Sequence, residues 1–262
     1  MKDRFGQWRL KSGNRAFNYL YNSFCVIFCL CLLAALLVMV GFLPPFGRAE
    51  NPAHNEVPQR YLRQGIHETG AVNVVSGMIL DYRAFDTFGE ACVLFVAVCA
   101  VLALLRKDKR DIFDELLNDM EESTQDIILM QVSRYIAPMI AVFGIYVVIN
   151  GHISPGGGFS GGAILGSAMI LYAFSFGTIE AQRVLSYDNC RRIMSCALIF
   201  YSLLKGCSIY MGANGLHSVI PLGTPGAIFS AGLILPLNIA VGLIVACTMY
   251  ILCILFSKGE MP

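Results

Sequence analysis

The chain has 262 residues, of which 56% are hydrophobic and 14% are charged, and its formal net charge is +1. Because soluble domains carry roughly a quarter charged residues, this composition excludes a large water-soluble core. A net charge close to zero also gives no sign of a nucleic-acid partner.

Six apolar stretches are each long enough to cross a bilayer as a helix, which takes about 20 residues. In chain order they lie at residues 21–43, 88–105, 127–149, 158–177, 193–212 and 228–256. Gln131, Ser133 and Arg134 fall in the first turns of the third stretch, so these turns could lie at the interface. The pattern predicts an all-α integral membrane protein with about six transmembrane helices.

The apolar tract 71–105 is too long for a single span. As one helix it would extend about 52 Å at 1.5 Å per residue, whereas the hydrocarbon layer is roughly 30 Å thick. We therefore expect a short interfacial helix, a break near residues 83–87 and then the second span. The prolines of the preceding loop, 44–70, exclude one continuous helix there.

Residues 106–126 form a long charged stretch. They separate an N-terminal two-span region, 1–105, from a C-terminal four-span region, 127–262, and act either as a solvated linker or as a helix that docks a partner. With six spans, thirteen Lys and Arg residues fall on one side of the membrane and four on the other. Because basic residues accumulate on the cytoplasmic side, we expect both termini in the cytoplasm.

The glycine-rich stretch NGHISPGGGFSGG, residues 150–162, matches the G-x-G-x-x-G pattern of dinucleotide sites. Such a site needs a strand before the glycines and a soluble helix after them. Both flanks here are apolar spans, so we reject nucleotide binding. Gly158, Gly162 and Gly166 instead recur every four residues, which predicts a smooth stripe for close helix packing.

Polar residues near this turn and in the last span have two interpretations each. Pro155 helps to form the turn, and His152 within it is either a hydrogen-bonded interface residue or part of a proton or ion relay. Pro236 and Asn238 lie in the last span. Proline frees a backbone carbonyl and asparagine has a polar side chain, and in lipid both groups must find partners. They form either a helix–helix seam or the lining of a hydrated ion path.

Acidic residues gather at the expected break. Asp86 and Glu90 are four residues apart, so on a helix they share a face, and they could pass on a proton or hold a sodium ion. Alternatively, Thr87-x-x-Glu90 is a capping box, with Asp86 or Thr87 as the N-cap. We expect Asp81 and Arg83 at the interface, in an ion pair with each other or with Asp86.

Lys205 lies inside the fifth span, where an ammonium costs at least about 2.5 kcal/mol. It either extends to the interface or is buried beside a carboxylate. Arg134 and Asp126 could pair near the boundary of the third span, where anchoring is the simpler role. The ten cysteines match no metal-binding motif, so we expect no metal site and interpret the cysteines as packing residues.

Three motifs resemble a known family. Residues 127–256, with NGHISPGGGFSGGAILG and GTPGAIFSAGLILPLNIAVGL, resemble the B subunit of Mrp-type multisubunit sodium/proton antiporters and the matching subunit of membrane-bound hydrogenases. Residues 71–105, with VNVVSGMILDYRAFDTFGE, resemble the end of the antiporter A subunit. Lys205 belongs to none of these motifs. The residues carried over are Asp81, Asp86 and Glu90 in the first region, and His152, Pro155, Gly156–Gly158, Pro236 and Asn238 in the second.

The resemblance implies a non-enzymatic membrane subunit of a multisubunit cation/proton antiporter, contributing to a Na+/H+ path and to assembly. Its partners would be other membrane subunits and the lipid bilayer, with no nucleic acid, nucleotide or cofactor, and Na+ and H+ as transported ions. We expect it in a prokaryotic cell membrane. The alternatives are a subunit of a membrane-bound hydrogenase or other redox-driven pump, and a non-conducting scaffold that docks larger subunits through the glycine stripe.

Overall fold

The computed structural model of the chain describes residues 3–43, 47, 55–104, 127–214 and 220–257. These residues form helices, turns and loops, with no strand among them. Six of the described helices are long and apolar enough to cross a membrane, which confirms the expected all-α membrane fold. The six membrane-length segments are Tyr19–Gly41, Ala84–Leu104, Ile127–Ile149, Gly158–Phe176, Tyr187–Ala213 and Ile234–Phe256.

Two compact units divide the chain between Pro58 and Gln59. The first contains helix α1 (Asp3–Gly41), whose membrane-length part has no buried residue within the structure. Its apolar side chains are exposed along that whole part, as expected for a helix surrounded by lipid or by other subunits.

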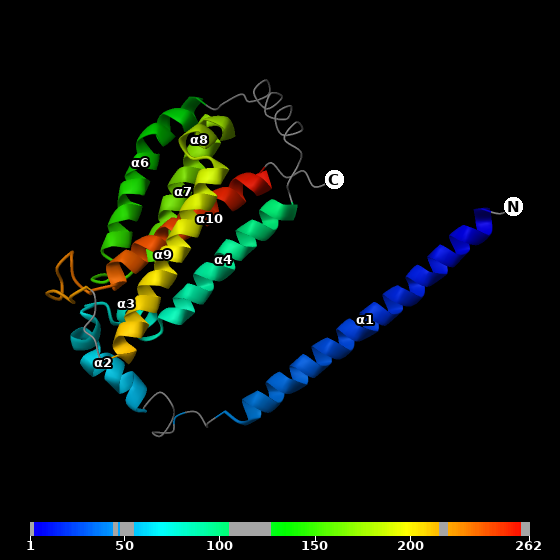
Figure 1. Cartoon of the computed structure of the whole chain (residues 1–262). Helices are drawn as coiled ribbons and strands as arrows, with labels where there is room; N and C mark the ends of the chain where they lie inside the picture. The colour runs from blue at the N-terminus through cyan, green and yellow to red at the C-terminus, as the bar shows by residue number, and fades with distance from the viewer. Residues whose placement is uncertain (1–2, 44–46, 48–54, 105–126, 215–219, 258–262) are drawn as a thin grey trace. The chain divides into compact units, whose positions relative to one another are not determined.

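The rest of the chain forms a helical bundle with shorter elements at its ends (Figure 1). Its elements are α2 (Glu56–Thr69), α3 (Val74–Gly77), a π-helical turn (Met78–Tyr82), α4 (Ala84–Leu104), α6 (Ile127–Ile149), α7 (Gly158–Phe176), α8 (Thr178–Val184), α9 (Tyr187–Ala213) and α10 (Ile234–Ser257).

Helix α10 is the centre of this bundle and packs against α4, α6, α7 and α9. Of its most apolar 18-residue window, 61% is buried, a larger share than in the other described spans. Leu237, Ile244 and Ile251 on this helix are fully buried. This burial, together with an exposed side that is apolar, fits the absence of charged residues from α10. Because α4 packs on α9 and α10, the second span shares one core with the four-span region defined from the sequence.

The tract 71–105 divides as expected into a short helix, a break and a span. The break lies at Arg83, with φ −117° and ψ 38°, and α4 begins at Ala84 instead of residue 88. Helix α2 in the preceding loop was not expected. Pro58 lies in its first turn, where the missing N–H removes no helical hydrogen bond.

The last span begins six residues later than expected, at Ile234 instead of residue 228. Residues 228–233 belong to a turn-rich loop, in which Ala231 N–H donates to the Leu222 carbonyl at 2.8 Å. Pro236 therefore lies in the first turn of α10. The expectation that Pro236 frees a backbone carbonyl inside the span is wrong, because its partner position precedes the helix.

Candidate functional site

A partly buried ion pair joins α9 to the π-helical turn. Lys205 on α9 is 8% exposed, and its Nζ lies 2.7 Å from Asp81 Oδ1 and 3.3 Å from the Asp81 carbonyl oxygen. The Lys205 side chain is therefore buried beside a carboxylate, which is one of the two positions considered from the sequence. The identity of that carboxylate is new, because Asp81 was expected to pair with Arg83 if at all.

Hydrogen bonds around the break hold Asp81 in place. Thr87 Oγ1 on α4 donates to the Ile79 carbonyl of the π-helical turn at 2.8 Å. Tyr201, one turn before Lys205 on α9, donates to the carbonyl of Ala84 at 3.0 Å. Tyr201 thus holds the start of α4 against α9. Thr87 holds the turn that carries Asp81 against α4.

A cavity of about 220 Å³ lies beside the ion pair. Its other walls are mainly apolar and aromatic, including Phe88 and Tyr201, whose rings stack 5.5 Å apart. The Lys205 side chain is 10% exposed, whereas the Asp81 side chain is 37% exposed. The carboxylate is therefore the accessible member of the pair, and could accept a proton or a cation while the ammonium stays buried.

Asp86 and Glu90 lie on one exposed face of α4 and not at the Lys205 pair. Asp86 forms an exposed ion pair with Arg83 at 2.6 Å, as one of the expected alternatives had it. Glu90 is exposed and forms no ion pair with any residue in the described part of the chain. The capping-box interpretation is wrong, because α4 begins before Thr87, which is buried inside the helix.

His152 is fully buried in the turn between α6 and α7. Its Nε2 lies 3.0 Å from the Ala227 carbonyl and donates to it, which assigns the proton to this nitrogen and makes Nδ1 an acceptor in the neutral ring. That Nδ1 is buried without a hydrogen-bond partner among the described residues. His152 is thus an interface residue that ties the turn to the loop before α10.

Asn238 links the glycine turn to α10. Its Oδ1 accepts a hydrogen bond from the N–H of Gly158, the first residue of α7, at 2.9 Å. Before that residue, Gly156 and Gly157 have φ values of 133° and 112°, which residues other than glycine rarely adopt. The consecutive glycines therefore provide a tight turn and a close approach to Asn238. A helix–helix seam accounts for this contact.

The glycine stripe of α7 faces α10 of the same chain. A Cβ added at Gly158 or at Gly162 would lie 2.6 Å from a carbonyl oxygen of α10, and one at Gly166 would lie 3.0 Å from Met249 Cβ. Pro155 lies exposed in the turn ahead of the stripe, and Pro236 lies in the first turn of α10. Because α10 already occupies the stripe, a scaffold role would have to use other surfaces.

Asn73 is a connecting residue that the sequence analysis missed. Its Oδ1 caps α3 by accepting from Val75 N–H at 3.1 Å, and its Nδ2 donates to the carbonyls of Gly151 and Ser154. Its backbone N–H also donates to the His152 carbonyl at 3.0 Å. An asparagine immediately before an apolar run is an N-cap signal, and could have identified it.

A second missed cluster joins α2 to the π-helical turn. The Arg60 guanidinium on α2 bonds Glu68 at 2.9 Å, and the Tyr82 hydroxyl donates to the same carboxylate. Arg60, and after it Tyr82, lower the pKa of Glu68 below its ordinary value of 4.5. Burial and the Glu68 carboxylate raise the pKa of Tyr82 to about 12. No local spacing signals this cluster, because charged side chains on a helix usually pair at three or four residues.

Two family models match successive, non-overlapping regions of the chain. Residues 128–251 match a domain related to the MnhB subunit of Na+/H+ antiporter, and residues 33–115 match MbhE, the E subunit of MBH. The chain is 33% identical over 190 residues to an uncharacterized protein of Methanocaldococcus jannaschii, covering 65% of this chain and 71% of that protein. It is 27% identical over 145 residues to a Rhizobium meliloti protein named as a probable K(+)/H(+) antiporter A/B subunit, covering 48% of this chain and 14% of that protein.

Solved structures share the fold. A chain of the membrane-bound sulfane sulfur reductase (MBS), an archaeal respiratory membrane complex, matches with a TM-score of 0.65 and 26% identity over 90% of this chain and 97% of that chain. A chain of the Mrp complex from Dietzia sp. matches with a TM-score of 0.60 and 21% identity, over 90% of this chain and 26% of that chain. Together with the six membrane-length helices, the matches show that the chain belongs to the MnhB-related family of membrane subunits of cation/proton antiporter-type complexes.

Proposed function

We propose that the chain contributes part of a Na+ or H+ path to a multisubunit cation/proton antiporter-type complex, and that Asp81 and Lys205 are its working residues. The chain would act as a transport subunit beside other membrane subunits, without a cofactor of its own. It would lie in a prokaryotic cell membrane with both termini in the cytoplasm. The regions 1–105 and 127–262 would correspond to two subunits joined through the charged segment.

The ion pair of Asp81 and Lys205 is the observation that carries this proposal. Ionisable groups within membrane spans are costly, and they mark ion or proton pathways by default. The Asp81 carboxylate is 37% exposed beside a cavity of about 220 Å³, while its partner ammonium is buried. An arriving proton or cation would neutralise the carboxylate and weaken its hold on Lys205, so occupancy of the cavity and the position of the lysine are coupled.

The path within this chain would be incomplete. Helices α7 and α10 contain no charged residue, and a proton route across a membrane uses several ionisable groups in series. Asp86 and Glu90 face outward from α4, where a neighbouring subunit would continue the route. His152 lies in the turn before α7, and Asn238 of α10 accepts a hydrogen bond from the first residue of α7, so we assign both to the seam.

Cation-driven proton movement in inverted membrane vesicles tests the proposal. Complexes containing Asp81→Asn should lose most of the cation-dependent pH change, because the variant carboxamide cannot take up a proton or carry a charge. Assembly is checked in the same vesicles by capture through a tag on this chain. Normal transport in an assembled Asp81→Asn complex would refute the proposed role of Asp81.

A redox-coupled host complex is a second candidate, favoured by the likeness to the MBS chain over 97% of that chain. Purification through a tag on this chain separates the two. Iron and acid-labile sulfide in stoichiometric amounts among the co-purifying subunits would indicate a redox-driven pump. Their absence from an assembled, transport-active complex would indicate a stand-alone antiporter.

A further inference from the structure

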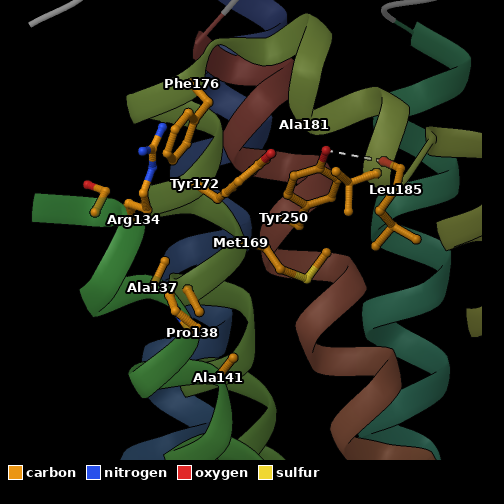
Figure 2. A pocket seen from close by; sticks show the side chains of 13 residues that line it. Arg134, Ala137, Pro138, Ala141, Met169, Tyr172, Phe176, Ala181, Leu185 and Tyr250 are labelled. Carbon is orange, nitrogen blue, oxygen red and sulfur yellow. Dashed lines mark hydrogen bonds between the residues drawn. The ribbon is translucent and has the colours of Figure 1, made fainter. Parts of the chain in front are cut away.

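A groove of about 520 Å³ lies between α6, α7, α8 and α10, outside the site described above. Figure 2 shows its lining, in which side chains from these helices surround the open space. Its size falls within the roughly 300–1,000 Å³ of ligand sites. The residues that define it include Ala137, Pro138 and Ala141 of α6, Met169 and Tyr172 of α7, and Tyr250 of α10.

The groove lies between two places where α6 and α7 are in close contact, the Ser133–Ser175 hydrogen bond at one end and a pair of glycines at the other. At the glycine end Gly144 of α6 meets Leu165, and Gly161 of α7 meets Val148, and a Cβ added at either glycine would lie within 2.8 Å of its neighbour. Between the two contacts, small side chains such as Ala137 and Ala168 face the space between the helices. Ala137 and Ala168 are too short to fill it, so the space stays open.

Arg134 gives the apolar groove a positively charged rim. It lies about 10 Å along α6 from Ile127, at 1.5 Å per residue, and Figure 2 shows its guanidinium beside the Phe176 ring. No carboxylate lines the groove, and Arg134 forms no ion pair with any residue that the structure describes. The pairing with Asp126 considered from the sequence lies outside the described residues.

Two of the neighbouring hydroxyl groups already donate hydrogen bonds. The hydroxyl of Ser175 donates to that of Ser133 at 2.5 Å, and the Tyr250 hydroxyl donates to the Leu185 carbonyl at 3.2 Å. The second of these bonds is drawn in Figure 2. Among the described residues that line the groove, Arg134 is the charged one, and no described carboxylate complements its guanidinium.

We propose that this groove binds an anionic phospholipid, with an acyl chain between α6 and α7 and the phosphate on Arg134. The spans place the groove in a bilayer, where acyl chains are the apolar molecules at highest concentration. A guanidinium binds phosphate oxygens with two parallel hydrogen bonds, and its aliphatic stem can reach towards the headgroup region from inside the span. A helix of a partner subunit could fill the apolar space only if it also brought a carboxylate to Arg134, and the experiment below separates this occupant from a lipid.

Photo-crosslinking with defined lipids in nanodiscs tests the proposal on the complete complex. Phosphatidylglycerol and phosphatidylcholine probes carry the same photoreactive acyl chain, and labelled peptides are mapped by mass spectrometry. The phosphatidylglycerol probe should label α6 and α7 about tenfold more strongly, as one charge-assisted contact predicts. Arg134→Gln should reduce its labelling to that of phosphatidylcholine, whereas Ala141→Phe, which fills the groove, should reduce both.

Arg192→Gln is the matched control, because Arg192 is an exposed arginine of α9 that does not line the groove. It should leave both probes unchanged. Equal labelling by the two probes in the wild type, or an unaltered preference in Arg134→Gln, overturns the proposal. So does labelling by neither probe, which would mean that a protein segment fills the groove. If Ala141→Phe fails to assemble, the Arg134→Gln comparison still decides.

Discussion

The ammonium of Lys205 lies 2.7 Å from the carboxylate of Asp81, although 124 residues separate the two in the chain. Asp81 falls in the region that matches the E subunit of MBH, and Lys205 falls in the region that matches the MnhB-related domain. The pair therefore connects the two matched regions at the level of single side chains. Its two members differ in exposure, and this difference gives a specific prediction.

We expect Asp81→Asn to lower stability more than Lys205→Gln. Removing the carboxylate leaves a buried ammonium without a partner, which costs about 3–5 kcal/mol, whereas removing the lysine leaves a carboxylate that is 37% exposed and can be hydrated. The double variant should recover most of the loss. Thermal denaturation of all three variants in detergent checks this order, and equal losses in the two single variants would contradict it.

Gly162→Ala should destabilise the bundle by about 1–3 kcal/mol, as overpacking does in cores. The added Cβ would lie 2.6 Å from the Gly242 carbonyl oxygen of α10. Gly89→Ala is the matched control, since a Cβ on this residue of α4 meets nothing within 4 Å and alanine favours helix by about 1 kcal/mol. The two variants should shift the melting temperature in opposite directions. A stabilised Gly162→Ala would rule out the close α7–α10 contact.

Asn73→Ala should loosen the turn between α6 and α7. The change removes side-chain hydrogen bonds to the Gly151 and Ser154 carbonyls and the cap of α3. Amide hydrogen exchange over residues 150–158 should become faster, with little change in α10. Asn214→Ala, which removes one exposed bond to the Tyr210 carbonyl, should leave this turn protected. Unchanged exchange in Asn73→Ala would contradict the bridging role.

Acidification should release α2 from the π-helical turn. The pKa of Glu68 is lower in the folded state than its ordinary value of 4.5, because Arg60 and Tyr82 bond the carboxylate. Its contribution to stability is therefore complete above the unfolded-state pKa and is lost as the pH falls below 4.5 and through the folded-state value. An acid-tolerant protease can be used at both neutral and acidic pH. Its cleavage of α2 near Arg63 should increase on acidification.

Glu68→Gln should abolish most of that pH dependence, because the carboxamide does not titrate. Cleavage of α2 in this variant should already be fast at neutral pH. A wild-type protein whose α2 resists cleavage equally at both pH values would show that the Arg60–Glu68–Tyr82 cluster does not hold this helix.

The spans were predictable from sequence because length and apolarity alone define them. The span 127–149 was expected at the residues where α6 begins and ends. The start of α10 was not, because Ile228 and Phe229 are apolar although they lie in a loop. That loop is fixed by contacts between distant segments, such as the hydrogen bond between His152 and the Ala227 carbonyl, and no local pattern reveals them.

The site was only partly predictable for the same reason. The sequence left open whether Lys205 extends to the interface or is buried beside a carboxylate, and it did not identify that carboxylate as Asp81. That pairing depends on the break at Arg83, after which α4 carries Asp86 and Glu90 on an exposed face. The glycine stripe was recognised as a packing surface, but the helix that fills it belongs to the same chain.

Cation-dependent proton movement by complexes carrying both Asp81→Asn and Lys205→Gln tests the central claim most directly. The double variant contains no unpaired charge at the site, so it should assemble like the wild type and still fail to exchange protons for cations. An assembled double variant that transports at the wild-type rate would show that the pair only holds helices together, and would contradict its place in the ion path.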